Sequence, residues 1–196
     1  MNIFAELTYI GVVIWAIVPL RQYKQKYFLF FLFTAYADVM TVFARFFFHS
    51  KTNFFFPTFS FLALCSLLDY KTIKKYGITL ILLFVITCLV GLDNNTLGIA
   101  GYLMVAMSLS IMHSFILFIF LKQFITTFYS KQNLINLFLL ILIIHEIMYV
   151  AKFLNYLTGF INGYFYLNFT TSFGILFGIF FIIFKADSPR LVFQLK

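Results

Sequence analysis

Charged residues are scarce in this 196-residue chain. Only 10% of its positions are Asp, Glu, Lys or Arg, while 63% are hydrophobic. A soluble domain usually has about a quarter charged residues and about half apolar ones. With so few charges, the chain cannot cover a folded surface with side chains suited to water. The composition therefore excludes an ordinary soluble domain and predicts an integral membrane protein whose main partner is the lipid bilayer.

The sequence also lacks the common signatures of metal, redox and nucleotide chemistry. Its two cysteines, Cys65 and Cys88, fall in different apolar runs and form no Cys-x-x-Cys motif. The pair His145-Glu146 begins like the zinc-protease motif HExxH, but Tyr149 occupies the position where the second histidine is required. We therefore predict no metal site and no cofactor.

Long apolar runs follow one another through almost the whole chain. A helix needs roughly 20 apolar residues to cross about 30 Å of hydrocarbon. The third and fourth runs are short, so they require a thinner bilayer or shielding by neighbouring helices. The predicted fold is all-α: one seven-helix transmembrane domain over residues 1–185, followed by a short basic cytoplasmic tail at 186–196. The seven predicted spans are 3–20, 27–48, 54–68, 77–92, 97–121, 134–157 and 161–184.

The basic residues give the predicted orientation. With seven crossings, the connections after spans 1, 3 and 5 and the tail lie on one side and hold 11 of the 14 Lys and Arg residues. Only Arg45, Lys51 and Lys152 remain on the other side. Because short cytoplasmic loops carry an excess of basic residues, we expect the N-terminus outside and the C-terminus in the cytoplasm. The predicted location is a cell membrane, either a bacterial inner membrane or an organellar membrane.

The net charge of +8 does not by itself indicate a nucleic-acid partner. Nucleic-acid binding requires basic residues gathered on one exposed face. Here they lie in short connections between apolar runs, where orientation in the membrane and contact with anionic headgroups account for them. We predict no nucleic-acid partner.

A polar stripe runs along the second span. Thr34, Asp38, Thr41 and Arg45 occur at i, i+4, i+7 and i+11, which places them on one face of a helix. Ionisable groups inside a membrane are costly unless they are paired or hydrated, so they mark candidate sites. Two interpretations remain open: a structural ion pair, either Asp38–Arg45 or between helices, or a site for a ligand or ion.

The sixth span carries a second stripe. His145, Tyr149 and Lys152 share one helix face, and Glu146 is rotated from His145 by about 100°. A purely structural alternative has Lys152 extending to the surface and Glu146 paired with Arg45. A haem between His113 and His145 is a further alternative, because two histidines on antiparallel helices can ligate one iron.

These polar residues fall mainly in the outer half of the predicted bundle. Asn168 adds an amide on the seventh span. We expect spans 1, 2, 6 and 7 to surround one outward-facing pocket, with spans 3 and 4 at the periphery. The predicted lining consists of Asp38, Arg45, His145, Glu146 and Asn168, with Tyr149 and Lys152 completing the candidate site.

The preferred functional hypothesis is a non-enzymatic, sensor-like or accessory subunit. With no soluble domain predicted, its signal must pass to a separate protein partner through the short basic loops. One alternative is a small transporter in which Asp38, Glu146 and His145 relay a proton or cation. The others are an intramembrane enzyme and a haem-binding protein, for which the sequence offers no complete motif.

Overall fold

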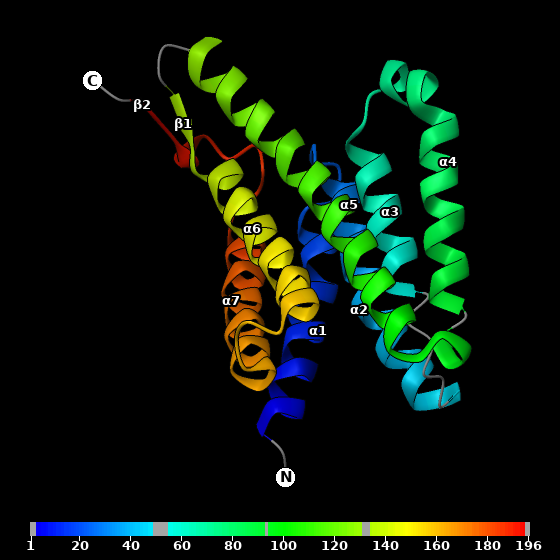
Figure 1. The fold of residues 1–196 in the computed structure, drawn as a ribbon. Coiled ribbons are helices and arrows are strands. Elements are labelled where there is room, and N and C mark those ends of the chain that lie inside the picture. Colours follow the sequence, from blue (N-terminus) through cyan, green and yellow to red (C-terminus); the bar gives the residue numbers. More distant parts are fainter. Residues whose placement is uncertain (1–2, 49–54, 93, 131–133, 195–196) are drawn as a thin grey trace.

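The computed structural model describes residues 3–48, 55–92, 94–130 and 134–194. The described chain forms seven α-helices that run up and down between two ends of one bundle (Figure 1). This confirms the all-α prediction. The helices are α1 (Ile3–Arg21), α2 (Phe28–Phe48), α3 (Phe55–Leu67), α4 (Tyr70–Leu92), α5 (Asn94–Ser130), α6 (Leu137–Thr158) and α7 (Gly163–Ile183).

Three helical segments within the described residues are long and apolar enough to cross a membrane. They are Gly101–Ser130, Leu137–Thr158 and Phe165–Ile183. The segments Phe28–Ala44 and Phe55–Leu67 are apolar helices of shorter length. Length and composition therefore support a membrane protein.

Parts of two predicted connections are helical instead. Helix α5 continues to Ser130, although a loop was predicted from residue 122, and no Gly or Pro between these positions interrupts it. At 37 residues it is about 55 Å long, so it exceeds the thickness of the hydrocarbon core. Helix α4 begins at Tyr70 because the Asp69 carboxylate accepts a hydrogen bond from the Thr72 backbone N–H at 2.8 Å. Lys71, Lys74 and Lys75, which fall between the predicted third and fourth spans, thus lie on the first turns of a helix.

The C-terminal segment folds back onto the bundle. After a 3₁₀ turn at Pro189–Leu191, strand β2 (Val192–Gln194) pairs antiparallel with β1 (Leu134–Asn136), which precedes α6. The Asn136 side chain then accepts a hydrogen bond from Leu139 N and caps α6. The segment predicted as a simple basic tail is therefore attached to the body, at the end of the bundle opposite the N-terminus (Figure 1).

Aromatic rings fill the core at one end of the bundle. Phe30, Phe31, Phe120, Phe138 and Phe181 come from four helices, and each is at most 1% exposed. Rings in contact at edge-to-face or tilted angles pack favourably, as Phe31 and Phe181 do with ring centroids 4.9 Å apart. This cluster joins α2, α5, α6 and α7 into one body.

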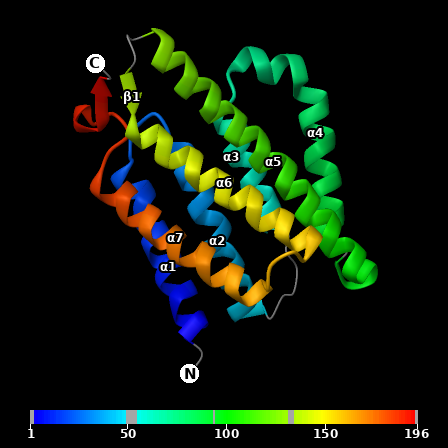
Figure 2. The same ribbon diagram turned by 60° about the vertical axis from the view of Figure 1, so that its left-hand side comes forward.

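Helices α1 and α7 lie side by side (Figures 1 and 2). Gly178 allows this approach, because a Cβ there would lie 2.6 Å from the Ile14 Cγ2 atom. One turn away, the Trp15 indole N–H donates to the Gly174 carbonyl at 3.0 Å. The small residues of α7 thus place Trp15 and the facing side of α7 around one space.

The prediction that spans 3 and 4 lie at the periphery of the bundle is correct for α4 and wrong for α3. Helix α4 contacts only α3 and α5 substantially and leaves many apolar side chains exposed, at the edge of the bundle in Figure 1. Helix α3 buries Ser60, Phe61 and Leu64 against α2 and α5. Its short length and lack of charge suggested a marginal position, but these features equally fit a helix packed on both sides by other helices.

Candidate functional site

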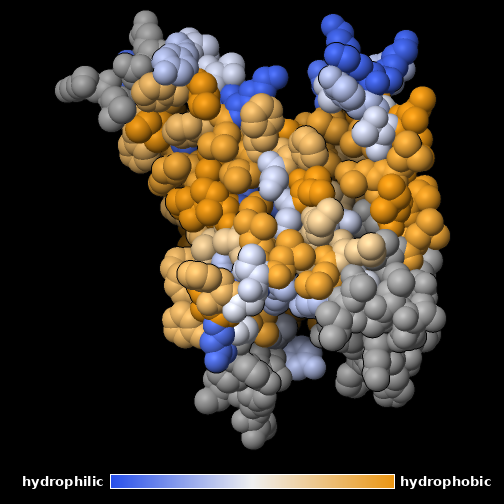
Figure 3. All heavy atoms as spheres, in the orientation of Figure 1, coloured by the Kyte–Doolittle hydropathy of each residue, from blue (hydrophilic) through white to orange (hydrophobic). Residues whose placement is uncertain are grey.

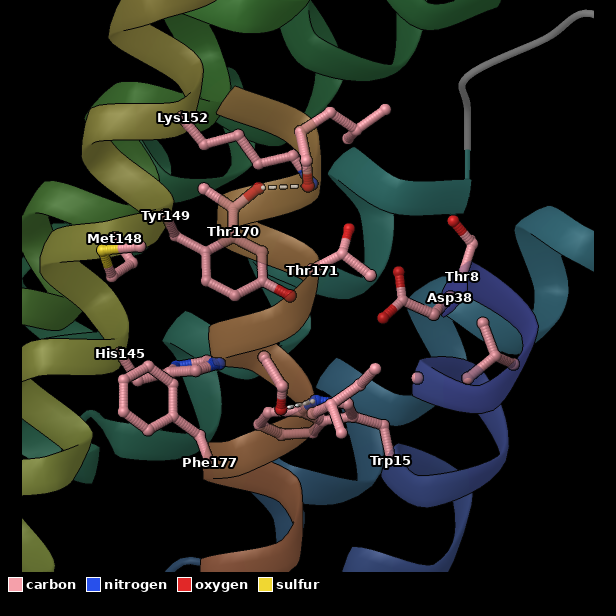
Figure 4. A pocket seen from close by; sticks show the side chains of 15 residues that line it. Thr8, Trp15, Asp38, His145, Met148, Tyr149, Lys152, Thr170, Thr171 and Phe177 are labelled. Atoms are coloured by element: carbon pink, nitrogen blue, oxygen red, sulfur yellow. Dashed lines mark hydrogen bonds between the residues drawn. The ribbon is translucent and has the colours of Figure 1, made fainter. Parts of the chain in front are cut away.

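A cavity of about 130 Å³ lies between α1, α2, α6 and α7 (Figure 4). These are the four helices predicted to surround a pocket. Its wall combines charged, hydroxyl and aromatic side chains. The lining residues with polar or aromatic side chains are Thr8, Trp15, Asp38, His145, Tyr149, Lys152, Thr170, Thr171 and Phe177.

Helical spacing brings each of these side chains to the cavity. His145, Tyr149 and Lys152 follow at i, i+4 and i+7 on α6 and present one face. Asp38 approaches from the middle of α2, and Thr171 from α7. Figure 4 shows the Asp38 carboxylate, the Tyr149 hydroxyl and the Thr171 hydroxyl directed toward a common space. The cavity is therefore polar where the three helices face one another.

Opposite charges line this cavity without touching. Asp38 and Lys152 are both on its wall, yet they form no direct ion pair with each other. The Lys152 ammonium lies 5.6 Å from the centroid of the Tyr149 ring, within range of a cation–π contact. Two separated charges in a low-dielectric cavity attract polar or oppositely charged groups strongly. The arrangement suits a small molecule or hydrated ion placed between them.

A buried hydrogen-bonded chain lies behind the cavity wall. The Glu146 carboxylate accepts from His113 Nδ1 at 2.7 Å and from His145 Nδ1 at 3.0 Å. His113 Nε2 in turn lies 3.4 Å from the Ser60 hydroxyl oxygen. Glu146 is 0% exposed, and the two histidine residues are at most 4% exposed. The chain Ser60–His113–Glu146–His145 thus connects α3, α5 and α6 across the bundle.

This chain leaves one polar atom of His145 without a hydrogen-bond partner among the described residues. Because its Nδ1 is bonded to Glu146, the Nε2 atom is the remaining polar group of the ring. Nε2 is buried and has no hydrogen-bond partner among the described residues. The ring extends into the space shown in Figure 4. Since a buried polar atom without a partner is costly, the geometry favours a bound group that bonds to Nε2.

The predicted site residues divide into three groups. Asp38, His145, Tyr149 and Lys152 meet at the cavity. The described lining does not include Glu146, which is bonded behind His145, or Asn168, which lies on α7. Arg45 is part of α2, but its side chain lies outside the described residues.

The geometry argues against two of the alternatives predicted for the histidines and Glu146. Glu146 is paired with two histidines, so the alternative that relied on Arg45 as its partner is not needed. His113 and His145 point their Nδ1 atoms at one carboxylate, while His113 Nε2 faces Ser60 and His145 Nε2 is buried without a partner among the described residues. A haem requires one nitrogen from each ring directed at a single iron. These two rings are held in an arrangement that does not fit that requirement.

Ser60, His113 and Glu146 have the side-chain types of a hydrolase triad. However, the Ser60–His113 separation of 3.4 Å is long, and Ser60 is only 4% exposed and is not part of the cavity lining. A nucleophile must reach its substrate. The arrangement therefore suits a hydrogen-bonded chain better than an acyl-transfer site.

Sequence reasoning missed Ser60 and Trp15 as contributors. Ser60 lies on the short helix predicted to be peripheral, and Trp15 is an apolar-run residue with no charged neighbour in its span except Glu6. For His113 the sequence suggests a haem ligand or, more commonly for a buried histidine, an interhelical hydrogen bond, but it does not identify the partner. The signal available for His113 is its depth in the predicted fifth span, which differs from that of His145 in the antiparallel sixth span by only about 5 Å at 1.5 Å per residue.

Comparison of the chain with protein-family models, with curated proteins and with solved structures found no match. The class defined by the fold is an all-α protein with candidate membrane-spanning helices. Its function must be inferred from the cavity and the buried chain.

Proposed function

We propose that this chain is a seven-span membrane protein that binds a small polar ligand from the extracytoplasmic side, in a sensor-like or accessory role. The observation that carries the proposal is the cavity, with Asp38 and Lys152 on its wall and the buried, unpartnered Nε2 of His145. A ligand with a hydrogen-bond donor satisfies a neutral imidazole there. A cationic or donor group near Asp38 and an acceptor near Lys152 complete the recognition.

The arrangement of the two ends supports seven crossings. Helix α1 begins at one end of the bundle, and strand β2 lies at the opposite end, as an odd number of crossings requires (Figure 1). Figure 3 shows strongly hydrophilic residues gathered at the end that carries the α3–α4 connection, with a broad hydrophobic surface below. Lys71, Lys74 and Lys75 are exposed there. Under the positive-inside rule this end faces the cytoplasm.

The ligand signal passes through packed helices. His145 links the cavity to Glu146 and His113, so a change at Nε2 alters a chain that connects α6 with α5 and α3. Helix α5 continues to Ser130, past the apolar bundle, at the basic end of the molecule (Figure 1). We propose that a cytoplasmic or membrane partner contacts this end.

A second candidate function is a small transporter with a proton relay. The continuous chain Ser60–His113–Glu146–His145 favours it, because carboxylates and imidazoles in series pass protons. The two roles differ in one measurable respect: only the transporter moves protons across the membrane of proteoliposomes under an imposed gradient.

Cysteine labelling tests the proposed topology. Single cysteines are introduced at Lys24, Ile73, Ser130 and Thr158 after both native cysteines are replaced by serine. We expect a membrane-impermeant thiol reagent to label position 158 on intact cells, and the other three only after permeabilisation. Labelling of position 73 on intact cells would contradict the seven-span arrangement, because that end carries the basic residues.

A further inference from the structure

A second, larger cleft lies between α4 and the facing surfaces of α3 and α5. Its volume is about 830 Å³, and it is distinct from the polar cavity. One part is apolar. Its aliphatic and phenylalanine lining consists of Leu64, Leu67, Leu68, Leu80, Leu83, Phe115, Phe118 and Ile119.

The other part of the cleft is polar and basic. Lys26 and Lys122 lie on its wall with Thr72, Gln123 and Asp69. The Lys26 ammonium donates to Gln123 Oε1 at 3.1 Å, and the Tyr27 hydroxyl donates to the same oxygen at 2.6 Å. These bonds attach Lys26, which lies on the α1–α2 connection, to α5 at the wall of the cleft.

Asp69 is the one acidic residue among those that line this cleft. Hydrogen bonds from the side chain and backbone of Thr72 lower the pKa of Asp69, so it remains a carboxylate. The two lysines still outnumber it. Lys71, Lys74 and Lys75, exposed on the first turns of α4, add positive charge at the same end. The field at this end therefore attracts anions.

The cleft has the dimensions of one bilayer leaflet. Along α4 it extends from Thr72 to Leu83, which is about 16 Å at 1.5 Å per residue. Half of a hydrocarbon core of about 30 Å is close to this length. The outer side of α4 exposes Ile78, Ile81 and Leu82, as expected for a helix beside lipid. Polar and apolar parts follow each other along the cleft in the order of a phospholipid headgroup and its acyl chains.

We propose that this cleft binds an anionic glycerophospholipid of the cytoplasmic leaflet, with its phosphate at Lys26 and Lys122 and an acyl chain along Leu80, Leu83 and Phe118. The proposal rests on the proposed membrane crossing of α4 and α5, and it is independent of any ligand in the polar cavity. A phosphate oxygen accepts charge-assisted hydrogen bonds from the lysines. Acyl chains cover apolar walls that otherwise surround an open space between helices.

Native mass spectrometry of the full chain in detergent tests this binding with phosphatidylglycerol and phosphatidylcholine of identical acyl chains. We expect the wild type to retain phosphatidylglycerol preferentially. The variant K26Q/K122Q should lose this preference, with affinity for phosphatidylglycerol reduced about thirtyfold, because each of the two lysines near a membrane surface contributes about 1 kcal/mol.

The matched control is K24Q/K185Q, which removes the same charge from two exposed lysines at the same end that do not line the cleft. It should keep the preference of the wild type. Equal loss in both double variants would overturn the proposal by showing that general surface charge attracts the lipid. Equal binding of both lipids by the wild type would also overturn it, as would a co-purifying protein that occupies the cleft and excludes lipid. None of these results depends on whether the polar cavity binds a ligand, or on the outcome of the cysteine-labelling test of topology.

Discussion

Replacing Glu146 with leucine should lower the free energy of unfolding by about 3–5 kcal/mol. Removing one partner of a buried pair typically costs this much, because the groups left behind stay buried and unpaired. Here one carboxylate satisfies two imidazole N–H groups, His113 Nδ1 at 2.7 Å and His145 Nδ1 at 3.0 Å. The loss is measured by reversible unfolding in mixed detergent micelles.

The same substitution at Glu6 provides the control. Glu6 is exposed on α1, so E6L should leave the free energy of unfolding within about 0.5 kcal/mol of the wild type. The variant E146Q should be milder than E146L, since an amide offers one acceptor and one donor and a neutral imidazole can change tautomer to match. Equal stability of E146L and E6L would contradict the buried chain.

Replacing Gln22 with leucine should have an effect of similar size, at the basic end of the bundle. Gln22 is 0% exposed. Its Nε2 donates to the carbonyls of Phe181 and Phe184 at 2.6 and 2.7 Å, and its Oε1 accepts from Ala186 N at 3.2 Å. The side chain thus caps the C-terminal carbonyls of α7 and holds the following segment.

Leucine at position 22 fills a similar volume but leaves these three backbone groups without their partner. Each buried unsatisfied group costs about 1–3 kcal/mol, so we expect Q22L to cost roughly 3 kcal/mol or more. The matched control is Q25L. The Gln25 side chain accepts one long bond, 3.4 Å from Asp187 N, in an exposed contact. Similar unfolding free energies for Q22L and Q25L would show that α7 does not depend on this cap.

The sequence predicted the helical class and the four helices around the cavity, because a stripe of polar residues with helical spacing has to face protein or water inside an apolar bundle. Asp38 belongs to such a stripe on α2, and it lines the cavity. The i, i+4, i+7 pattern on α6 likewise predicted that His145, Tyr149 and Lys152 share a face. These features depend only on periodicity within one helix.

What the sequence did not predict depends on contacts between helices. Periodicity placed Glu146 about 100° from His145, but it could not show that His113 of α5 lies within 2.7 Å of the carboxylate. Nor could it show that Ser60 of α3 lies beside His113. The end of α5 was missed because a continuous helix extends beyond the apolar run, where composition changes but helix propensity does not.

The most direct test of the proposed function is the accessibility of the cavity from outside the cell. Thr171 lines the cavity, whereas the next residue of α7, Ser172, is exposed on the outer surface of the bundle. In a membrane that surface faces lipid, where a thiol does not ionise and does not react with charged reagents. The two positions thus differ in surroundings but not in depth.

The measurement compares T171C with S172C, both without native cysteines, on intact cells exposed to a small, charged, membrane-impermeant methanethiosulfonate. We predict that T171C is modified and S172C is not, since only the cavity supplies water and a path from the extracytoplasmic side. Modification of S172C alone, or of T171C only after permeabilisation, would contradict an outward-open polar cavity in a seven-span bundle.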